Sequence, residues 1–583
     1  MWVTNAKHLF LADPYFYHLL EKNDELRNYE TIQVAKSQRA TMQEFLRDHE
    51  FVDDKFRKYT HLLASRLNKA HGLAYDELFW RKALSLSLLR HVTFCYNLFQ
   101  ACETNFSPYL HDCNILAPTS YYIPEDFDEH RRVFQHTDLG QEQLFSVYCG
   151  LFYSGQFKLR QVNPTLPAPI VTQTERHSGR WRRITPRKLA RRFMCFRDPT
   201  VGILNAFFSL ENLDRLLFQS KGRIQTVTLP AIPASTSVIR WDMREQLVCE
   251  EPDFDRFDRF VFACLLHGLP KIFVEDFKLV CDQLNNHFNR YKSLRWIVSE
   301  AWIGHNLSAL ALAILQQRDV KHIYNEHNYL SYFFLGTNLK YLAPLVDEFV
   351  SLGWEDSSTP NLVRGASLFQ WVDKEAVRDK EHEILFVLSV PIMYVPEINA
   401  AYGESGAYCA QKYLDMNQRF LGRLGEETLG KIYVRSYPLR VMRDWLTWDQ
   451  AFVLAPYLSK VKVYDDNSAI SGQSLIQRSR LVIANYLSTT YLESIIANVP
   501  TIFILNKDAY LLTEKYMEFF DALIDVGVCQ TNPEEAADFV NRIKDDPEQW
   551  WGSSPVQNAR AVFLNANIGN PEIMIQHLLE KAN

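Results

Sequence analysis

The stretch that decides the fold class spans residues 481–505 and reads LVIANYLSTTYLESIIANVPTIFIL. Its first four residues form an apolar run typical of a buried strand, and Thr501–Leu505 form a second one. Between the two runs, Pro500 ends a helix whose apolar residues recur at helical spacing, namely Leu492, Ile495, Ile496 and Val499. The stretch therefore predicts a strand–helix–strand unit with a right-handed crossover and parallel strands.

The same alternation of strands and helices extends toward the N-terminus. Apolar runs at 384–390, 431–435 and 461–464 predict three further strands, which complete a doubly wound domain. Two more runs, 295–299 and 320–324, flank a helix that begins at Asn306 and predict a second parallel unit. We therefore expect an α/β, GT-B-like fold, in which two Rossmann-like domains face a cleft.

The N-terminal part of the chain follows a different pattern. From Phe56 to Gln100 there is one glycine, Gly72, and no proline, and apolar residues recur at roughly helical spacing. Together these patterns predict five segments: a helical region over 1–160, a first domain over 161–352, a polar linker over 353–382, a second domain over 383–565 and a C-terminal helix over 566–583. By analogy with GT-B glycosyltransferases, the first domain would be the acceptor-side domain and the second the nucleotide-sugar-binding domain.

Composition narrows the class of protein. The chain has 583 residues, of which 47% are hydrophobic and 23% charged, as in soluble globular enzymes. Its net charge of −6 argues against a nucleic-acid partner, because binding to phosphates needs a basic excess. The ten cysteines form no CxxC pair, so we expect no structural metal. No signal peptide and no apolar window of membrane-spanning length is visible, and we expect a cytoplasmic protein with buried thiols.

Three consecutive hydroxyl residues open the helix within 481–505. Ser488, Thr489 and Thr490 follow the carboxyl end of a parallel strand, where free N–H groups and the helix dipole favour an anion. Glu493 lies one turn further on, where its carboxylate can accept hydrogen bonds from a ribose. The alternative is simple helix capping, although one hydroxyl is enough for that.

A second candidate for phosphate binding follows the strand at 431–435. Arg435 can form paired hydrogen bonds with a phosphate, and Pro438 fixes the turn in which Tyr437 lies. The alternative is a plain turn with solvated arginines. Together with Ser488–Thr490 and Glu493, these three residues form the predicted donor-binding set.

The candidate catalytic residues follow the strand at 320–324. Glu326 and His327 are each able to act as a general base toward an acceptor hydroxyl, and Glu326 could instead act as a nucleophile or charge stabiliser. His305, which follows the preceding strand, would lie beside them. The alternative is an ordinary polar loop.

A basic segment over 176–197 contains nine basic and no acidic residues. Its interspersed apolar residues suggest an interfacial helix that binds anionic lipid at a membrane surface. The alternatives are a solvated run of charges and a channel for an acidic substrate.

Five local patterns occur between about residues 56 and 565: Leu67–Gly72 with Phe79-Trp80-Arg81; Leu269-Pro270-Lys271 with Phe277; Leu352-Gly353-Trp354; Arg435–Pro438 with Asp444-Trp445; and Ser488–Glu493 with Asn498–Thr501 and Trp550-Trp551. In this order they resemble a family of transferases found beside bacterial O-antigen and surface-polysaccharide biosynthesis genes. The resemblance implies a GT-B-like glycosyltransferase with a nucleotide-sugar donor and a surface-glycan or lipid-linked acceptor. It implies no cofactor, because the nucleotide sugar is a substrate.

One loop departs from the family pattern. The family usually carries Gln-His-Gly-Gly where this chain has Glu326–Tyr329, so His327 carries over and both glycines are absent. The loop is also similar to that of bacterial transferases that use cytidine-monophosphate sugars, which suggests such a donor. No DxD pair stands out at a sheet edge, as in metal-independent GT-B enzymes. Three alternatives remain: a sugar-nucleotide epimerase, a polyol-phosphate transferase and a non-catalytic scaffold of a glycan-assembly complex.

Overall fold

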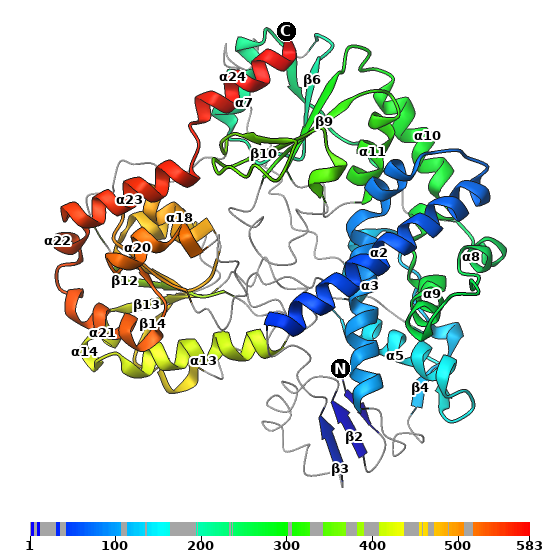
Figure 1. Cartoon of the computed structure of the whole chain (residues 1–583), viewed down its shortest axis with the longest axis horizontal. Helices are drawn as coiled ribbons and strands as arrows, with labels where there is room; N and C mark the ends of the chain where they lie inside the picture. The colour runs from blue at the N-terminus through cyan, green and yellow to red at the C-terminus, as the bar shows by residue number, and fades with distance from the viewer. Residues whose placement is uncertain are drawn as a thin grey trace, which may run out of the picture.

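A computed structural model of the 583-residue chain defines the fold. It describes residues 2–4, 8–11, 31–34, 42–105, 114–134, 137–163, 194, 196–232, 235, 237–300, 306–326, 342–368, 380, 382–389, 407–436, 454–457, 459–464, 471–487, 489–505 and 517–583. Two parallel sheets and a group of helices make up most of these residues (Figure 1).

The first sheet has six parallel strands in the order β11-β10-β9-β8-β6-β7. Their bounds are β6 Val201–Leu204, β7 Ile224–Thr226, β8 Trp296–Ser299, β9 Lys321–Asn325, β10 Glu348–Ser351 and β11 Leu362–Arg364. Helix α7 (Leu210–Gln219) connects β6 to β7, and α11 (Asn306–Gln316) connects β8 to β9. The parallel unit expected over 295–324 is therefore present.

The second sheet also has six parallel strands, in the order β14-β13-β12-β15-β16-β17. Their bounds are β12 His382–Val387, β13 Ile432–Arg435, β14 Lys462–Val463, β15 Ser479–Ala484, β16 Thr501–Ile504 and β17 Cys529–Gln530. The unit predicted over 481–505 is β15, α18 (Thr489–Ile496) and β16, and both of these strands are completely buried over their shared register. Because each sheet is doubly wound, the predicted α/β class with two Rossmann-like domains is confirmed.

The remaining helices of this second half surround its sheet and continue beyond it. They are α13 Ala407–Arg423, α14 Glu426–Gly430, α17 Gly472–Gln477, α20 Asp521–Asp525, α21 Pro533–Ile543, α22 Pro547–Trp551, α23 Ser554–Asn567 and α24 Pro571–Ala582.

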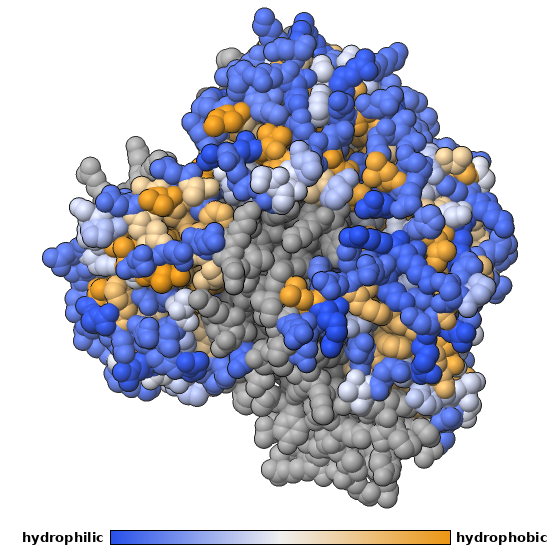
Figure 2. Space-filling model, in the orientation of Figure 1, coloured by the Kyte–Doolittle hydropathy of each residue, from blue (hydrophilic) through white to orange (hydrophobic). Residues whose placement is uncertain are grey.

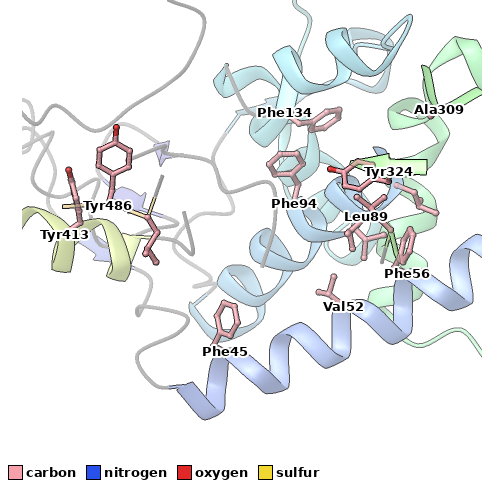
Figure 3. Packing of buried hydrophobic residues seen from close by; sticks show 14 of the residues in the cluster. Phe45, Val52, Phe56, Leu89, Phe94, Phe134, Ala309, Tyr324, Tyr413 and Tyr486 are labelled. Carbon is pink, nitrogen blue, oxygen red and sulfur yellow. The ribbon is translucent and has the colours of Figure 1, made fainter. Parts of the chain in front are cut away.

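The N-terminal region is largely helical, as expected. Its helices are α2 Met42–His71, α3 Glu77–Asn105, α4 Phe127–Phe134 and α5 Asp138–Phe152, with α8 Trp241–Leu247, α9 Arg256–Gly268 and α10 Phe277–Phe288 added from later in the chain. Short 3₁₀ turns lie at Pro118–Ser120, Lys271–Phe273 and Ala343–Leu345. The first sheet packs through α11 against α3, and Figure 3 labels Tyr324 of β9 and Leu89 of α3 among the buried residues of the shared core.

Several short strands lie where the sequence gave no strand signal. They are β1 Trp2–Thr4, β2 His8–Leu11, β3 Thr31–Val34, β4 Asn114–Leu116 and β5 Lys158–Arg160. Strand β11 lies inside the stretch 353–382 that we expected to be a linker, and Leu368 beyond it is also buried against the first sheet. A strand of three or four residues is too short to show a periodicity, which explains why these elements escape pattern analysis.

The C-terminal helix α24 leaves the second sheet and packs against α7, β6 and β7 of the first (Figure 1). On the way, Gly569 donates its backbone N–H to the carbonyl oxygen of Leu352 at 2.8 Å. A Cβ atom at Gly569 would lie 1.7 Å from the carbonyl oxygen of Gly365, and one at Gly353 would lie 2.1 Å from the Gly569 nitrogen. The two chain segments therefore cross at a distance that only glycine permits.

We expect the substitution Gly569→Ala to destabilise the protein by about 1–3 kcal/mol, because the backbone at Gly365 must move to admit the methyl group. Thermal and urea denaturation measure the loss. The matched control is Gly150→Ala on the exposed face of α5, where a Cβ meets nothing within 4 Å and alanine favours the helix. Equal stability of the two variants would contradict the close approach of the backbone segments at Gly365 and Gly569.

Candidate functional site

The carboxyl edge of the second sheet brings together two residues of the predicted donor-binding set. Arg435 ends β13, and Glu493 lies on α18, which follows β15. The positive charge of Arg435 acts on the Glu493 carboxyl, which also accepts a hydrogen bond from Gln473 Nε2 at 3.3 Å. Burial nevertheless dominates and raises the pKa of Glu493 to about 7.

A glycine makes room for the guanidinium at this edge. A Cβ at Gly472, the first residue of α17, would lie 2.4 Å from Arg435 Nη1. Arg435 therefore lies directly against the backbone of Gly472, with Gln473 beside it on the same helix. The result is a cation and an acid side by side at the edge where open α/β sheets bind ligands.

The predicted hydroxyl residues of α18 differ in their surroundings. Thr489, the first residue of the helix, is exposed. Thr490 is buried, and its Oγ1 lies 3.0 Å from the hydroxyl oxygen of Tyr486. Ser488, Tyr437 and Pro438 lie outside the described residues.

Sequence reasoning missed a buried polar network at the same edge. The order of the second sheet reverses between β12 and β15, and Tyr413 of α13 links the ends of these two strands. Its hydroxyl accepts the N–H of Ser389 at 2.7 Å and donates to Asn485 Oδ1 at 3.0 Å. Asn485 Nδ2 in turn donates to Asn417 Oδ1. Tyr413 and Tyr486 are both visible in Figure 3. The available signal was a polar residue within two positions of each strand end, Ser389 after β12 and Asn485 after β15.

At the carboxyl edge of the first sheet, the predicted catalytic candidate Glu326 is completely buried. Its Oε2 accepts hydrogen bonds from Trp354 Nε1 at 2.6 Å and from the N–H of Leu352 at 3.2 Å. Its Oε1 has no hydrogen-bond partner in the part of the chain that the structure describes. Burial raises the pKa of Glu326 to about 8. The other two candidates, His327 and His305, lie outside the described residues.

A second buried acid, Glu300, stands at this edge and was not predicted. It follows β8, and its two carboxylate oxygens accept hydrogen bonds from the N–H of Phe207 and from Asn325 Nδ2. Burial raises the pKa of Glu300 to about 7. Like Glu326, it directly follows an apolar strand, and that position was the only signal in the sequence.

The described residues contain no group of three or more histidine, cysteine or acidic side chains placed to hold a metal ion. Within the same residues, every helix is too short or too polar to cross a bilayer. The visible face in Figure 2 is mostly hydrophilic, with hydrophobic residues in small separate groups. Of the basic segment, only Met194, Phe196 and Arg197 are described.

A family model described as "LIC12162 family transferase" matches residues 1–580. The chain belongs to this family of transferases. The transferase expected from the sequence resemblance is thereby confirmed, while an association with surface-polysaccharide genes stays a prediction. No curated protein matches the chain.

Several solved structures are similar to the chain at low identity. The wall teichoic acid polymerase TagF, in a structure with CDPG, is 12% identical with a TM-score of 0.32, over 68% of this chain and 92% of that one. HepE of Anabaena, in complex with UDP and glucose, and MurG of Acinetobacter baumannii are each 11% identical with a TM-score of 0.34, over 66% of this chain and 98% of theirs.

In this transferase, three of the sequence patterns each contain a tryptophan whose indole N–H donates a hydrogen bond to a side chain. An indole N–H donates to a side-chain oxygen in each of three pairs: Trp80 to Asn68 at 2.9 Å, Trp354 to Glu326 at 2.6 Å and Trp551 to Asn498 at 2.9 Å. Asn498 has a φ of 57°, so the end of α18 turns in the left-handed region. Trp80 and Trp551 therefore hold asparagines that are not candidate chemical groups, whereas Trp354 holds the candidate acid Glu326.

We expect the substitution Glu326→Gln to remove a pH dependence of stability. A carboxyl whose pKa is raised from 4.5 to about 8 stabilises the fold most below pH 4.5, and this stabilisation is lost as the pH rises to about 8. The melting temperature of the variant minus that of the wild type should therefore increase between pH 5 and pH 8. The exposed Glu245 supplies the control, Glu245→Gln. A difference that stays constant with pH would contradict the raised pKa.

Proposed function

We propose that this chain is a glycosyltransferase that moves a sugar from a nucleotide-sugar donor to a surface-glycan or lipid-linked acceptor. Its membership of a transferase family and its two doubly wound sheets support the proposal. The two sheet edges also differ in chemistry. The second offers a cation and the start of a helix. The first offers the buried acids Glu300 and Glu326, and one oxygen of Glu326 has no hydrogen-bond partner among the described residues.

The observation that carries the proposal is the placement of Arg435 against α17, whose Gln473 donates a hydrogen bond to Glu493 of α18. Arg435 supplies a charge and two N–H groups for a phosphate, and the N–H groups and dipole of α18 add to them. Thr489 adds an exposed hydroxyl at the same helix end. Glu493 would accept hydrogen bonds from ribose hydroxyls. In this reading Ser488, Thr490, Tyr437 and Pro438 complete the donor site, and a cytidine-monophosphate sugar is the donor that the 326–329 loop suggests.

The acceptor would be activated at the first sheet. Glycosyl transfer requires that the acceptor hydroxyl lose its proton, and a positioned base contributes about 10²–10⁴-fold to the rate. We assign this role to Glu326, His327 or His305. Positive charge from Arg435 and the start of α18 would stabilise the leaving phosphate without a metal ion.

The substitution Glu326→Gln also separates catalysis from structure. The glutamine oxygen can keep both hydrogen bonds that Oε2 accepts from Trp354 and Leu352, so the fold should survive. A base, however, is lost. A large fall in turnover at unchanged nucleotide affinity would assign the base to Glu326, and full turnover would move it to one of the histidines.

We expect at least one of the cytidine, uridine, guanosine and thymidine mono- or diphosphates to raise the melting temperature of the protein. At 100 times its dissociation constant, a ligand stabilises the folded state by about 2.7 kcal/mol. The substitution Thr489→Val should lower the binding affinity for that nucleotide by about tenfold, because one hydrogen-bonding hydroxyl is removed. Isothermal titration calorimetry measures the affinity.

The control for that experiment is Thr104→Val, which changes another exposed threonine near a helix end in the N-terminal region. Its affinity should equal that of the wild type. If no nucleotide shifts the melting temperature of the wild type, the proposed function fails. If Thr489→Val binds as tightly as the control, the assignment of Thr489 fails.

We further propose that residues 176–197 bind an anionic membrane surface that presents a lipid-linked acceptor. Reversing the charge at Arg182, Arg183, Arg191 and Arg192 should abolish co-sedimentation with phosphatidylglycerol vesicles at low salt. Raising the salt should weaken binding of the wild type, since surface charges are screened over about 8–10 Å. Binding that does not depend on salt would rule the proposal out.

A further inference from the structure

The first sheet reverses its strand order between β6 and β8. Strand β6 pairs with β7 on one side and with β8 on the other, and the remaining strands continue beyond β8. Ligands of open α/β sheets bind at the carboxyl ends of the strands beside such a reversal. Three polar residues mark these ends: Asn205 after β6, Glu300 after β8 and Asn325 at the end of β9.

Glu300 ties these three strand ends together. One of its oxygens accepts the N–H of Phe207, in the segment that follows β6, and the other accepts Asn325 Nδ2. Asn205 has a φ of 50° and donates through Nδ2 to Ser308 Oγ of α11 at 2.6 Å. Both oxygens of Glu300 and the amide nitrogen of Asn205 are thus hydrogen-bonded to the backbone or to a neighbouring side chain.

One atom is left over. An ionised carboxylate only accepts hydrogen bonds, so the Asn325 amide must turn its nitrogen toward Glu300. Its Oδ1 then faces the other way, and it is buried with no hydrogen-bond partner among the residues that the structure describes. A buried amide oxygen without a donor is costly, which indicates that a ligand or a water molecule supplies one.

We propose that Asn325 Oδ1 accepts a hydrogen bond from a hydroxyl group of the sugar acceptor and so helps to select it. Glu300 is the positioning residue, because it fixes which end of the amide is presented. The inference rests on the proposed function, which supplies an acceptor rich in hydroxyl groups. It adds two residues that the predicted acceptor-side set of Glu326, His327 and His305 does not contain.

The substitution Glu300→Gln tests this role without removing an internal hydrogen bond. The backbone N–H of Phe207 can only donate, so the oxygen of the glutamine amide must accept it. The glutamine nitrogen then faces residue 325, and the Asn325 amide turns over to accept from it. The variant therefore presents an NH₂ group where the wild type presents an oxygen.

The double substitution Glu300→Gln with Asn325→Asp exchanges the two functional groups and keeps the net charge. One carboxylate oxygen at position 325 accepts from the glutamine nitrogen, and the other takes the place of Oδ1. The exchange therefore restores the acceptor atom, and a role limited to the structure of the edge would not predict this rescue.

The experiment measures binding of methyl glycosides of glucose, galactose and N-acetylglucosamine to the full chain by saturation-transfer NMR titration. It is carried out at pH 8.5, where Glu300 is ionised because its pKa lies at about 7. We expect at least one glycoside to bind the wild type, about tenfold weaker binding to Glu300→Gln, and recovery to within about threefold in the double variant. The nucleotide shift in melting temperature should be the same in all three proteins.

Equal glycoside affinity in Glu300→Gln and the wild type would overturn the inference, and so would a folded double variant without rescue. If no glycoside binds the wild type, Oδ1 holds a buried water only and the inference is wrong. Should Glu300→Gln not fold, Asn325→Leu removes the acceptor atom and must weaken binding by at least about tenfold. The proposed function is judged separately, since it fails when no nucleotide binds, whatever the glycosides do.

Discussion

The buried carboxylate of Glu326 is the contact on which the joining of the two halves depends. It accepts hydrogen bonds from Leu352 and Trp354, the residues on either side of Gly353. The turn held in this way offers its Leu352 carbonyl to Gly569, at the point where the C-terminal chain passes toward α24. Because the crossing leaves no room for a Cβ, its geometry tolerates little error. A single acid at the end of β9 therefore sets the path by which the last helix returns to the first sheet.

Both sheets use buried polar side chains to join strand ends, but the two edges carry different polar groups. Where the strand order reverses, each sheet ties the neighbouring strand ends with buried polar side chains, which are Glu300 and Asn325 in the first and Tyr413 and Asn485 in the second. Beside these side chains, Asn325 and Glu326 of the first sheet each have one oxygen without a partner among the described residues, whereas the second sheet places Arg435 at its edge. Unpaired acceptors favour hydroxyl groups, and a guanidinium favours phosphate. This asymmetry supports the proposed transfer from a phosphorylated donor to a hydroxylated acceptor.

The sequence predicts the architecture well because a long apolar run is compatible with few kinds of secondary structure. The unit over 481–505 and the strands around it follow from such runs. Arg435 and Glu493 lie at one sheet edge because Arg435 ends a strand of the second sheet and Glu493 is on the helix that follows another. Short elements such as β11 carry no periodicity and were missed. Glu300 was missed for another reason: a single acid after a strand has no pattern of its own, and its role appears only when β6, β8 and β9 are side by side.

The tryptophans explain why the family's sequence patterns are easier to recognise in the sequence than the candidate catalytic and binding residues. An indole is large, and its N–H must find an acceptor when it is buried, so each one constrains a neighbouring polar residue. Asn68, Asn498 and Glu326 are constrained in this way. Glu326 alone belongs to both groups, since one of its oxygens serves Trp354 and the other is unpaired among the described residues. A carboxyl fixed through one oxygen cannot rotate away from a ligand, so the structural bond to Trp354 would itself orient the atom that is free to act.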